Sequence, residues 1–142
     1  MSPRSPSPAD PPILLVEDKD SLRAMLRHAL EAQGHTVVEA RDQPEAETAL
    51  QSSHPAVVLS DLRLPEGDGF GVLRASKELD PQLPVIVMTA FGNPVVADRA
   101  RRLRADVYLE KPFRLAALVD EIRRVGSHGA SDGPWQGAGR SE

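Results

Sequence analysis

Cysteine is absent from the 142 residues, which excludes a disulfide framework. No apolar run approaches the ~20 residues needed to span a membrane, and no charged segment followed by an apolar one opens the chain. An excess of basic side chains is also lacking, since 17 Lys and Arg stand against 21 Asp and Glu. This balance argues against nonspecific binding to nucleic acid. We therefore expect a soluble, cytoplasmic protein that binds neither a membrane nor nucleic acid directly.

The length suits one folded domain with a low-complexity segment at each end. Residues 1–12 contain five prolines and three serines and offer almost nothing to bury, so we expect a disordered arm. Residues 126–142 contain five glycines and are typical of a flexible tail. The folded domain is therefore predicted to span residues 13–125.

Short β-branched runs alternate with amphipathic segments inside this domain, which is typical of βα units. The runs are residues 13–16, 36–40, 56–60, 85–89 and 106–109. Five such units predict an α/β fold, with a five-stranded, doubly wound parallel sheet covered by five helices on both faces. Sheets of this kind bind ligands at the carboxyl ends of their strands.

Apolar stripes at helical spacing lie between and after the strands. We assign to them Leu22, Met25, Leu26, Ala29 and Leu30 in the first helix, Phe70, Leu73 and Leu79 in the third, Val96, Ala97, Ala100 and Leu103 in the fourth, and Leu115, Leu118, Val119, Ile122 and Val125 in the fifth. Gly34 stands where a left-handed cap would end the first helix. Asp42 and Asn93 are each followed by a proline in the first turn, so both are predicted N-caps.

Acidic, hydroxyl and amine side chains collect at the predicted carboxyl ends of the strands. Glu17 and Asp18 follow the first strand, Asp61 the third, Thr89 ends the fourth and Lys111 follows the fifth. Three neighbouring carboxylates repel one another unless a cation intervenes, and Mg²⁺ with oxygen ligands satisfies that need. Asp61 is then the natural nucleophile for a phosphoryl group, with the metal and Lys111 neutralising charge.

The same residues carry a resemblance to a known family. Glu17 and Asp18 follow "ILLV", Asp61 lies in "LSDLRLPEGDGF", Thr89 in "VIVMTAFG", and "YLEKPF" covers residues 108–113. In order and spacing, residues 13–125 resemble the receiver domain of two-component response regulators, in a variety often found in the NtrC-like subfamily. This implies a flavodoxin-like fold with strand order 2-1-3-4-5.

The resemblance also implies a role for each matched position. These roles are phosphoacceptor for Asp61; metal ligand for Glu17, Asp18, Asp61 and the backbone carbonyl of Arg63; phosphate-pairing amine for Lys111; switch residue for Thr89 and Tyr108; and a cis peptide bond between Lys111 and Pro112. The side chains of Arg63 and Phe91 would flank the water that hydrolyses the phosphorylated acid.

The function implied is a phosphorylation-dependent signalling switch rather than an enzyme, with phosphoryl transfer and self-dephosphorylation as its only chemistry. A sensor histidine kinase would donate the phosphoryl group to Asp61 with Mg²⁺, and the surface of the fourth helix, fifth strand and fifth helix would change. The expected partners are that kinase, an unidentified downstream protein and a second copy in a phosphorylation-linked homodimer. The chain is either a stand-alone receiver or the front of a longer protein.

Other interpretations remain open. Glu17 and Asp18 could cap the first helix, and Tyr108 could be a core aromatic. The domain could shuttle phosphoryl groups in a phosphorelay, or be a phosphohydrolase of the haloacid-dehalogenase type in which Asp18 is the nucleophile and Asp20 the second acid. The chain also departs from the receiver pattern at Arg104, where a glycine is common, and we expect either slight strain in that turn or a shortened fourth helix.

Overall fold

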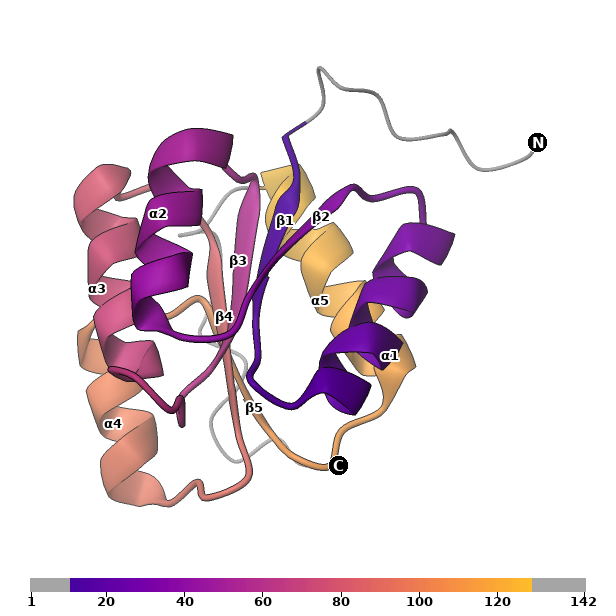
Figure 1. Cartoon of the computed structure of the whole chain (residues 1–142). Helices are drawn as coiled ribbons and strands as arrows, with labels where there is room; N and C mark the ends of the chain where they lie inside the picture. The colour runs from indigo at the N-terminus through magenta and orange to yellow at the C-terminus, as the bar shows by residue number, and fades with distance from the viewer. Residues whose placement is uncertain (1–10, 129–142) are drawn as a thin grey trace.

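The computed structural model describes residues 11–128, which form one parallel sheet with helices on both faces (Figure 1). The strand order is β2-β1-β3-β4-β5, and each pair of neighbours is parallel. Both the five-stranded doubly wound sheet and the order 2-1-3-4-5 expected from the sequence are therefore confirmed.

Five strands alternate with five helices through the described part of the chain. They are β1 (Ile13–Val16), α1 (Asp20–Ala32), β2 (Val37–Ala40), α2 (Gln43–Ser53), β3 (Val57–Asp61), α3 (Gly69–Leu79), β4 (Val85–Thr89), α4 (Pro94–Arg102), β5 (Val107–Glu110) and α5 (Leu115–His128). The predicted strands each lie within one residue of these bounds. The third strand ends at Asp61 itself, which pairs in register with Met88 of β4.

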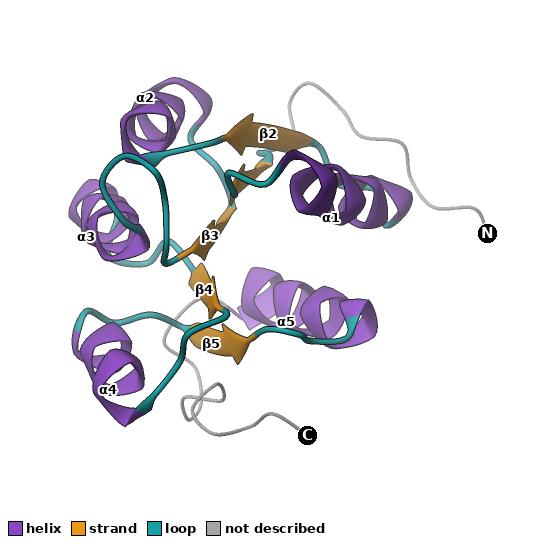
Figure 2. Cartoon of the chain, turned by 60° about the horizontal axis from the view of Figure 1, so that its bottom comes forward, coloured by secondary structure: helices purple, strands orange, loops and turns teal. Residues whose placement is uncertain are grey.

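The two faces of the sheet bury two separate apolar cores. Helices α1 and α5 cover one face, and α2, α3 and α4 cover the other (Figure 2). Alternate residues of a strand point to opposite faces, so Leu14 and Val16 of β1 join the core under α2 and α3, while Ile13 and Leu15 join the core under α1 and α5. The central strands β1, β3 and β4 are buried on both faces, which explains their uninterrupted apolar runs.

Side chains cap two helices as the sequence predicts. The Asp42 carboxylate accepts a hydrogen bond from the amide of Glu45 (2.9 Å), and the Asn93 side chain accepts one from the amide of Val96 (2.9 Å). A third cap, Asp68, was not predicted; it accepts from the Gly71 amide at the start of α3 (2.8 Å). These caps satisfy backbone donors that a helix leaves unpaired in its first turn.

Two turns use left-handed backbone conformations. Gly34, after α1, has φ of 93°, as the cap prediction requires. Arg104, after α4, has φ of 75°, a region that costs a residue with a Cβ about 1–2 kcal/mol. The strained turn is therefore present, and α4 also ends at Arg102, one residue before Leu103, which the sequence placed in this helix.

Two apolar residues assigned to helix stripes face solvent instead of the core. Met25 of α1 is 49% exposed and Leu79 at the end of α3 is 36% exposed. Leu26 and Leu30 of α1 are fully buried, because the sheet contacts only a narrow stripe of the helix and Met25 lies one residue, or about 100°, away from it.

The predicted arm and tail lie almost entirely outside the described residues. Of the arm, Pro12 is described, and its carbonyl accepts a hydrogen bond from the Ala56 amide (2.8 Å). At the other end, α5 continues to His128, three residues beyond the predicted boundary at 125. Over residues 11–128, no helix has the length and apolar character to traverse a bilayer.

Candidate phosphoryl-transfer site

Four strands bring the predicted site residues to one edge of the sheet. Glu17 directly follows β1, Asp61 ends β3, Thr89 ends β4 and Lys111 directly follows β5. Because all strands are parallel, their carboxyl ends meet at the edge that faces the viewer in Figure 2. Residues separated by up to 94 positions in the sequence are thereby placed in contact.

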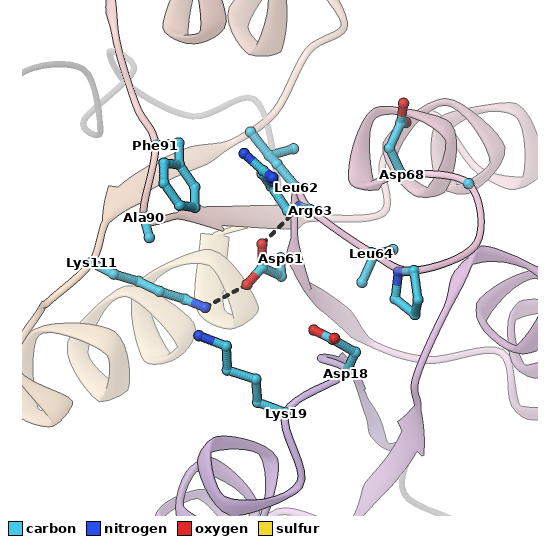
Figure 3. Close-up of a pocket in the computed structure, with 12 residues that line it drawn as sticks. Asp18, Lys19, Asp61, Leu62, Arg63, Leu64, Asp68, Ala90, Phe91 and Lys111 are labelled. Atoms are coloured by element: carbon cyan, nitrogen blue, oxygen red, sulfur yellow. Dashed lines mark hydrogen bonds and ion pairs between the residues drawn. The ribbon is translucent and has the colours of Figure 1, made fainter.

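Lys111 joins two of the three acids. Its ammonium donates to Asp61 Oδ2 and to Glu17 Oε1, the latter at 3.0 Å (Figure 3 shows the contact with Asp61). Glu17 is fully buried and Asp61 is 5% exposed. Buried charges are tolerated when they are paired and hydrogen-bonded, so this ammonium compensates two carboxylates at once.

The charges of this cluster depend on one another. Burial raises the pKa of the Glu17 carboxyl, although hydrogen bonds from the Lys19 amide and the Lys111 ammonium oppose that rise. Burial by itself would lower the pKa of Lys111, but hydrogen bonds to Asp61 and Glu17 outweigh it and raise that pKa above its usual value. Lys111 is therefore a permanent cation at neutral pH.

The other oxygen of Asp61 is held by the loop that follows β3. Asp61 Oδ1 accepts a hydrogen bond from the Arg63 amide (2.8 Å). The loop turns back on itself through a hydrogen bond from the Gly69 amide to the Leu62 carbonyl (3.0 Å). A Cβ at Gly69 would overlap the Asp61 carbonyl, so this close approach requires glycine.

A pocket of about 520 Å³ opens over Asp61. Its lining includes Asp18, Lys19, Arg63, Phe91 and Lys111, and the Asp18 carboxylate points toward Asp61 in Figure 3. Asp18 does not cap α1: the N-cap of that helix is Lys19, and within the described residues it makes no side-chain capping bond. The capping interpretation of the acidic pair is therefore not supported.

The adjacent acids Glu17 and Asp18 occupy different environments. Glu17 is buried against Lys111 and is absent from the pocket lining, whereas Asp18 is exposed within it. Between residues 11 and 128, no three His, Cys, Asp or Glu side chains are grouped so that they could hold a metal ion. Mg²⁺ commonly takes only one or two carboxylates and keeps several waters. Asp18 and Asp61, two hard oxygen donors that line the same pocket, suit that requirement.

The predicted switch residues lie beside the pocket rather than in its lining. Thr89 is 2% exposed, and its hydroxyl accepts a hydrogen bond from the Phe91 amide (3.0 Å). Tyr108 is fully buried and donates its hydroxyl to Glu110 Oε2 (3.2 Å). Burial and this carboxylate raise the pKa of Tyr108 to about 12. A Cβ at Gly92 would overlap the Tyr108 hydroxyl, so the loop before α4 packs directly over the phenol.

Arg63 and Phe91 meet at the mouth of the pocket. The guanidinium of Arg63 lies over the Phe91 ring, 4.3 Å from its centroid, at a distance typical of a cation–π contact. Phe91 is 61% exposed, and both side chains line the pocket. The peptide bond between Lys111 and Pro112 is cis.

Sequence reasoning missed Lys19 and Gln43. Lys19 lines the pocket, and its place directly after the acidic pair at a strand end could have indicated this. Gln43 hydrogen-bonds the amide of Asp68, 25 residues away, and no local pattern marks such a contact. The phosphohydrolase alternative is also not favoured, because Asp20, the second acid it requires, has an 86% exposed side chain paired with Arg23.

Comparisons with known proteins agree with this geometry. A family model described as the response regulator receiver domain matches residues 13–123. The C4-dicarboxylate transport transcriptional regulatory protein DctD of Pseudomonas aeruginosa is 41% identical over 125 residues, which cover 88% of this chain and 27% of that protein. The DNA-binding transcriptional regulator NtrC of Escherichia coli is 38% identical over 116 residues, which cover 82% of this chain and 25% of that protein.

A solved structure supports the same assignment. The receiver domain of NtrX from Brucella abortus superposes with a TM-score of 0.76 at 30% identity, covering 82% of this chain and 98% of that one. The chain spans only about a quarter of the length of the two curated relatives. On the family match, the identities and the fold together, this chain belongs to the receiver domains of two-component response regulators.

Proposed function

We propose that the chain is a phosphorylation-dependent switch in which Asp61 accepts the phosphoryl group. The observation that carries this proposal is the environment of the Asp61 carboxylate. One oxygen contacts the Lys111 ammonium, the other accepts from the Arg63 amide, and the carboxylate lines an open pocket opposite Asp18. An oriented carboxylate beside a fixed cation, open on one side, is suited to attack an incoming phosphorus atom.

The reaction would transfer one phosphoryl group without any redox step. An Asp61 oxygen forms a bond to phosphorus as the bond from phosphorus to the donor's imidazole nitrogen breaks. The donor imidazole already carries a proton on its other ring nitrogen, so it takes the bonding electron pair and leaves as neutral imidazole. Lys111 balances charge on the transferring oxygens and Asp61 stays oriented by Arg63. Mg²⁺, bound through Asp18, Asp61 and the Arg63 carbonyl, would supply further neutralisation of the phosphoryl oxygens.

The chemistry would be confined to the domain's own aspartate. Hydrolysis of the phosphorylated Asp61 requires water to approach through the pocket mouth, where Arg63 stacks on Phe91. These two side chains would therefore influence how long the phosphorylated state lasts. No separate substrate is turned over, so the chain acts as a switch rather than as an enzyme of the usual kind.

Thr89 and Tyr108 would link the pocket to an outer surface. Thr89 ends β4 next to Asp61, and Tyr108 is buried on β5 beneath the loop that leads to α4. A hydroxyl drawn toward a phosphoryl oxygen would release the Phe91 amide that it now accepts from. The resulting shift would change the surface of α4, β5 and α5, which we propose as the binding surface for a downstream protein or a second copy. The phosphodonor would be a sensor histidine kinase.

Labelling with a small phosphodonor tests the phosphoacceptor. With Mg²⁺ and acetyl phosphate, the intact chain should gain one phosphoryl group by mass spectrometry, and Asp61→Asn should gain none while keeping its circular dichroism spectrum. Asp120→Asn, which changes an exposed aspartate of α5, should label like the parent chain. Labelling of the Asp61→Asn chain at the parental rate would remove the central assignment.

A second variant tests the switch. Thr89→Ala should still be labelled, because Thr89 contributes no oxygen to the Asp61 contacts, but it should transmit less change to α4 and β5. Hydrogen–deuterium exchange of these elements, with and without beryllofluoride as a phosphoryl mimic, measures the response. Thr48→Ala, an exposed threonine of α2, is the matched control. A full parental response in Thr89→Ala would show that the switch lies elsewhere.

A further inference from the structure

Gln43 connects helix α2 to the loop that holds the site. It is the first residue of α2, yet it makes hydrogen bonds to two residues of the loop between β3 and α3. Its backbone amide donates to the Glu66 carbonyl (3.0 Å), and its side-chain Oε1 accepts from the Asp68 amide (3.0 Å). Its Nε2 donates to Glu47 Oε2 (2.8 Å), one turn further along the helix. Every polar atom of the Gln43 amide group thus has a partner that fixes its orientation.

Two glycines make room for this side chain. A Cβ at Gly67 or at Gly71 would overlap the Gln43 side-chain amide. Gly67 also has φ of 73°, a conformation that a larger residue adopts only with strain. Gly67 and Gly71 therefore both pack closely against the Gln43 side chain, so the loop and this side chain fit together at two points.

The contact leads directly to the phosphoacceptor. Asp68, whose amide Gln43 accepts from, forms an isolated antiparallel bridge with Arg63. Arg63 in turn donates its amide to Asp61 Oδ1. The same loop supplies much of the pocket wall through Leu64, Pro65, Gly67 and Asp68. Figure 3 labels Leu64 and Asp68 among them. The Gln43 side chain is thus connected to the hydrogen bond that orients Asp61 through two residues, Asp68 and Arg63.

We propose that Gln43 is a positioning residue for phosphoryl transfer, which holds the β3–α3 loop so that the Arg63 amide stays aimed at Asp61. This inference rests on the proposed function of Asp61. Without the Gln43 side chain, the Asp68 amide loses its acceptor and the space between Gly67 and Gly71 is empty. The loop then samples other conformations, and the Asp61 carboxylate spends less time oriented for attack.

The labelling rate measures this effect. With Mg²⁺ and saturating acetyl phosphate, Gln43→Ala should be labelled about tenfold more slowly than the parent chain, the size expected when a reacting group is misoriented rather than removed. Gln51→Ala, an exposed glutamine on the same helix, is the matched control and should keep the parental rate. The half-saturating acetyl phosphate concentration should change less than the maximal rate, because Gln43 does not touch the donor.

A reciprocal exchange separates positioning from a general loss of stability. Gln43→Glu keeps an acceptor for the Asp68 amide but sets a carboxylate against Glu47, so it should be slow. The double variant Gln43→Glu/Glu47→Gln restores a donor and acceptor between the two positions in reversed order, and should recover most of the parental rate. Failure of this rescue, with all variants equally folded by circular dichroism, would contradict the proposal.

Amide exchange gives a readout that needs no phosphodonor. In Gln43→Ala the Asp68 amide should exchange with solvent about tenfold faster or more, while amides of β1 keep their protection. A parent chain that takes no label refutes the proposed function. A parent chain that is labelled, with Gln43→Ala labelled equally fast, refutes the positioning role alone.

Discussion

Glu17 and Asp18 are neighbours in the sequence but lie in different environments, one buried and the other in the pocket. Successive residues at the end of a strand point in different directions, so Glu17 enters the buried contact with Lys111 while Asp18 enters the pocket. The sequence suggested an equivalent pair of metal ligands. We propose unequal roles: Asp18, which lines the pocket, as the direct donor for a cation, and Glu17, which contacts Lys111, as the acid that positions that amine.

Metal titration can separate these two roles. Asp18→Asn should weaken Mg²⁺ binding about tenfold or more, because it removes one of the two pocket carboxylates that we propose as metal ligands, Asp18 and Asp61. Glu17→Gln should weaken binding less, since Glu17 acts through Lys111. Isothermal titration calorimetry on both variants measures the difference. Equal losses, or a larger loss for Glu17→Gln, would contradict the assignment.

His35 predicts how stability depends on pH. Burial, with a smaller effect of Arg123, lowers the pKa of its imidazole below the usual 6.5. Between that value and the lower folded pKa, the unfolded chain binds more protons than the folded chain, so the free energy of unfolding falls as the pH falls. Relative to His35→Gln, the parent chain should lose stability as the pH falls from neutrality through the usual pKa of 6.5. Urea unfolding at several pH values gives the free energy of unfolding of both chains. A difference between them that stays constant over this pH range would contradict the prediction.

At the scale of elements, a buried ion pair joins α3 to the segments that lead into β4 and β5. Lys77 Nζ donates to Asp106 Oδ2 (2.8 Å) and to the Leu83 carbonyl (2.7 Å), and Asp106 also accepts from the Val85 amide (2.8 Å). Both side chains are at least 90% buried. Burial raises the pKa of Asp106 in spite of these partners. The pair lies at the opposite ends of β4 and β5 from the pocket, so its role is to hold α3 against the sheet.

Removing the cation of this pair should be costly. Lys77→Met leaves the Asp106 carboxylate buried without its counter-charge, and we expect a loss of about 3 kcal/mol in the free energy of unfolding. Lys77→Met/Asp106→Asn should recover part of the loss, because the amide oxygen still accepts from Val85. Arg101→Met, which breaks an exposed pair with Asp98, should cost less than about 1 kcal/mol. Equal costs in urea unfolding for the two single variants would contradict this reasoning.

In the turn from α4 to β5, by contrast, a substitution should raise the free energy of unfolding. Arg104 holds φ of 75°, which glycine adopts without steric cost. Arg104→Gly should therefore raise the free energy of unfolding by about 0.5–1 kcal/mol, the steric relief being partly offset by the entropy of glycine in the unfolded chain. Arg101→Gly inside α4 should lower it by about 1 kcal/mol. Thermal unfolding of both variants measures the contrast, and a destabilised Arg104→Gly would show that its side chain matters more than its backbone.

At the scale of the whole molecule, the site belongs to no single element. Its acids follow β1 or end β3, and its amine follows β5. The site therefore exists only when the strands have assembled in the order β2-β1-β3-β4-β5. A ligand that binds the assembled edge must therefore stabilise the entire fold. Binding to the folded state alone raises its stability by mass action.

Beryllofluoride with Mg²⁺ tests this coupling. At about 100 times its dissociation constant, the mimic should raise the free energy of unfolding by about 2.7 kcal/mol, visible as a higher melting temperature. Asp61→Asn should show no such rise, because it lacks the carboxylate that the mimic binds. An equal rise in both chains would mean that the mimic acts elsewhere. Light scattering of the same samples reports whether the mimic also drives the proposed homodimer.

Local interactions made much of this protein predictable from its sequence. Runs of β-branched residues located the five strands and apolar stripes located four of the five helices. Asp42 and Asn93 marked two helix starts, because caps and turns depend on residues within about four positions. The spacing of Glu17, Asp61, Thr89 and Lys111 relative to strand ends identified the site edge. That inference needed only the rule that parallel strands end together.

Tertiary packing decided the remainder, because it joins residues that no local pattern relates. The sequence by itself determined which side chains reach the edge of the sheet, but not that Lys111 would pair with Glu17 across 94 positions and leave Asp18 in the pocket with Asp61. Nor could it show that Gln43 supports the loop of Asp68, or that Met25 would be exposed. These contacts depend on how each helix packs on the twisted sheet. Rotating a helix about its axis by about 100°, the angle between successive residues, moves a side chain from the core to the solvent.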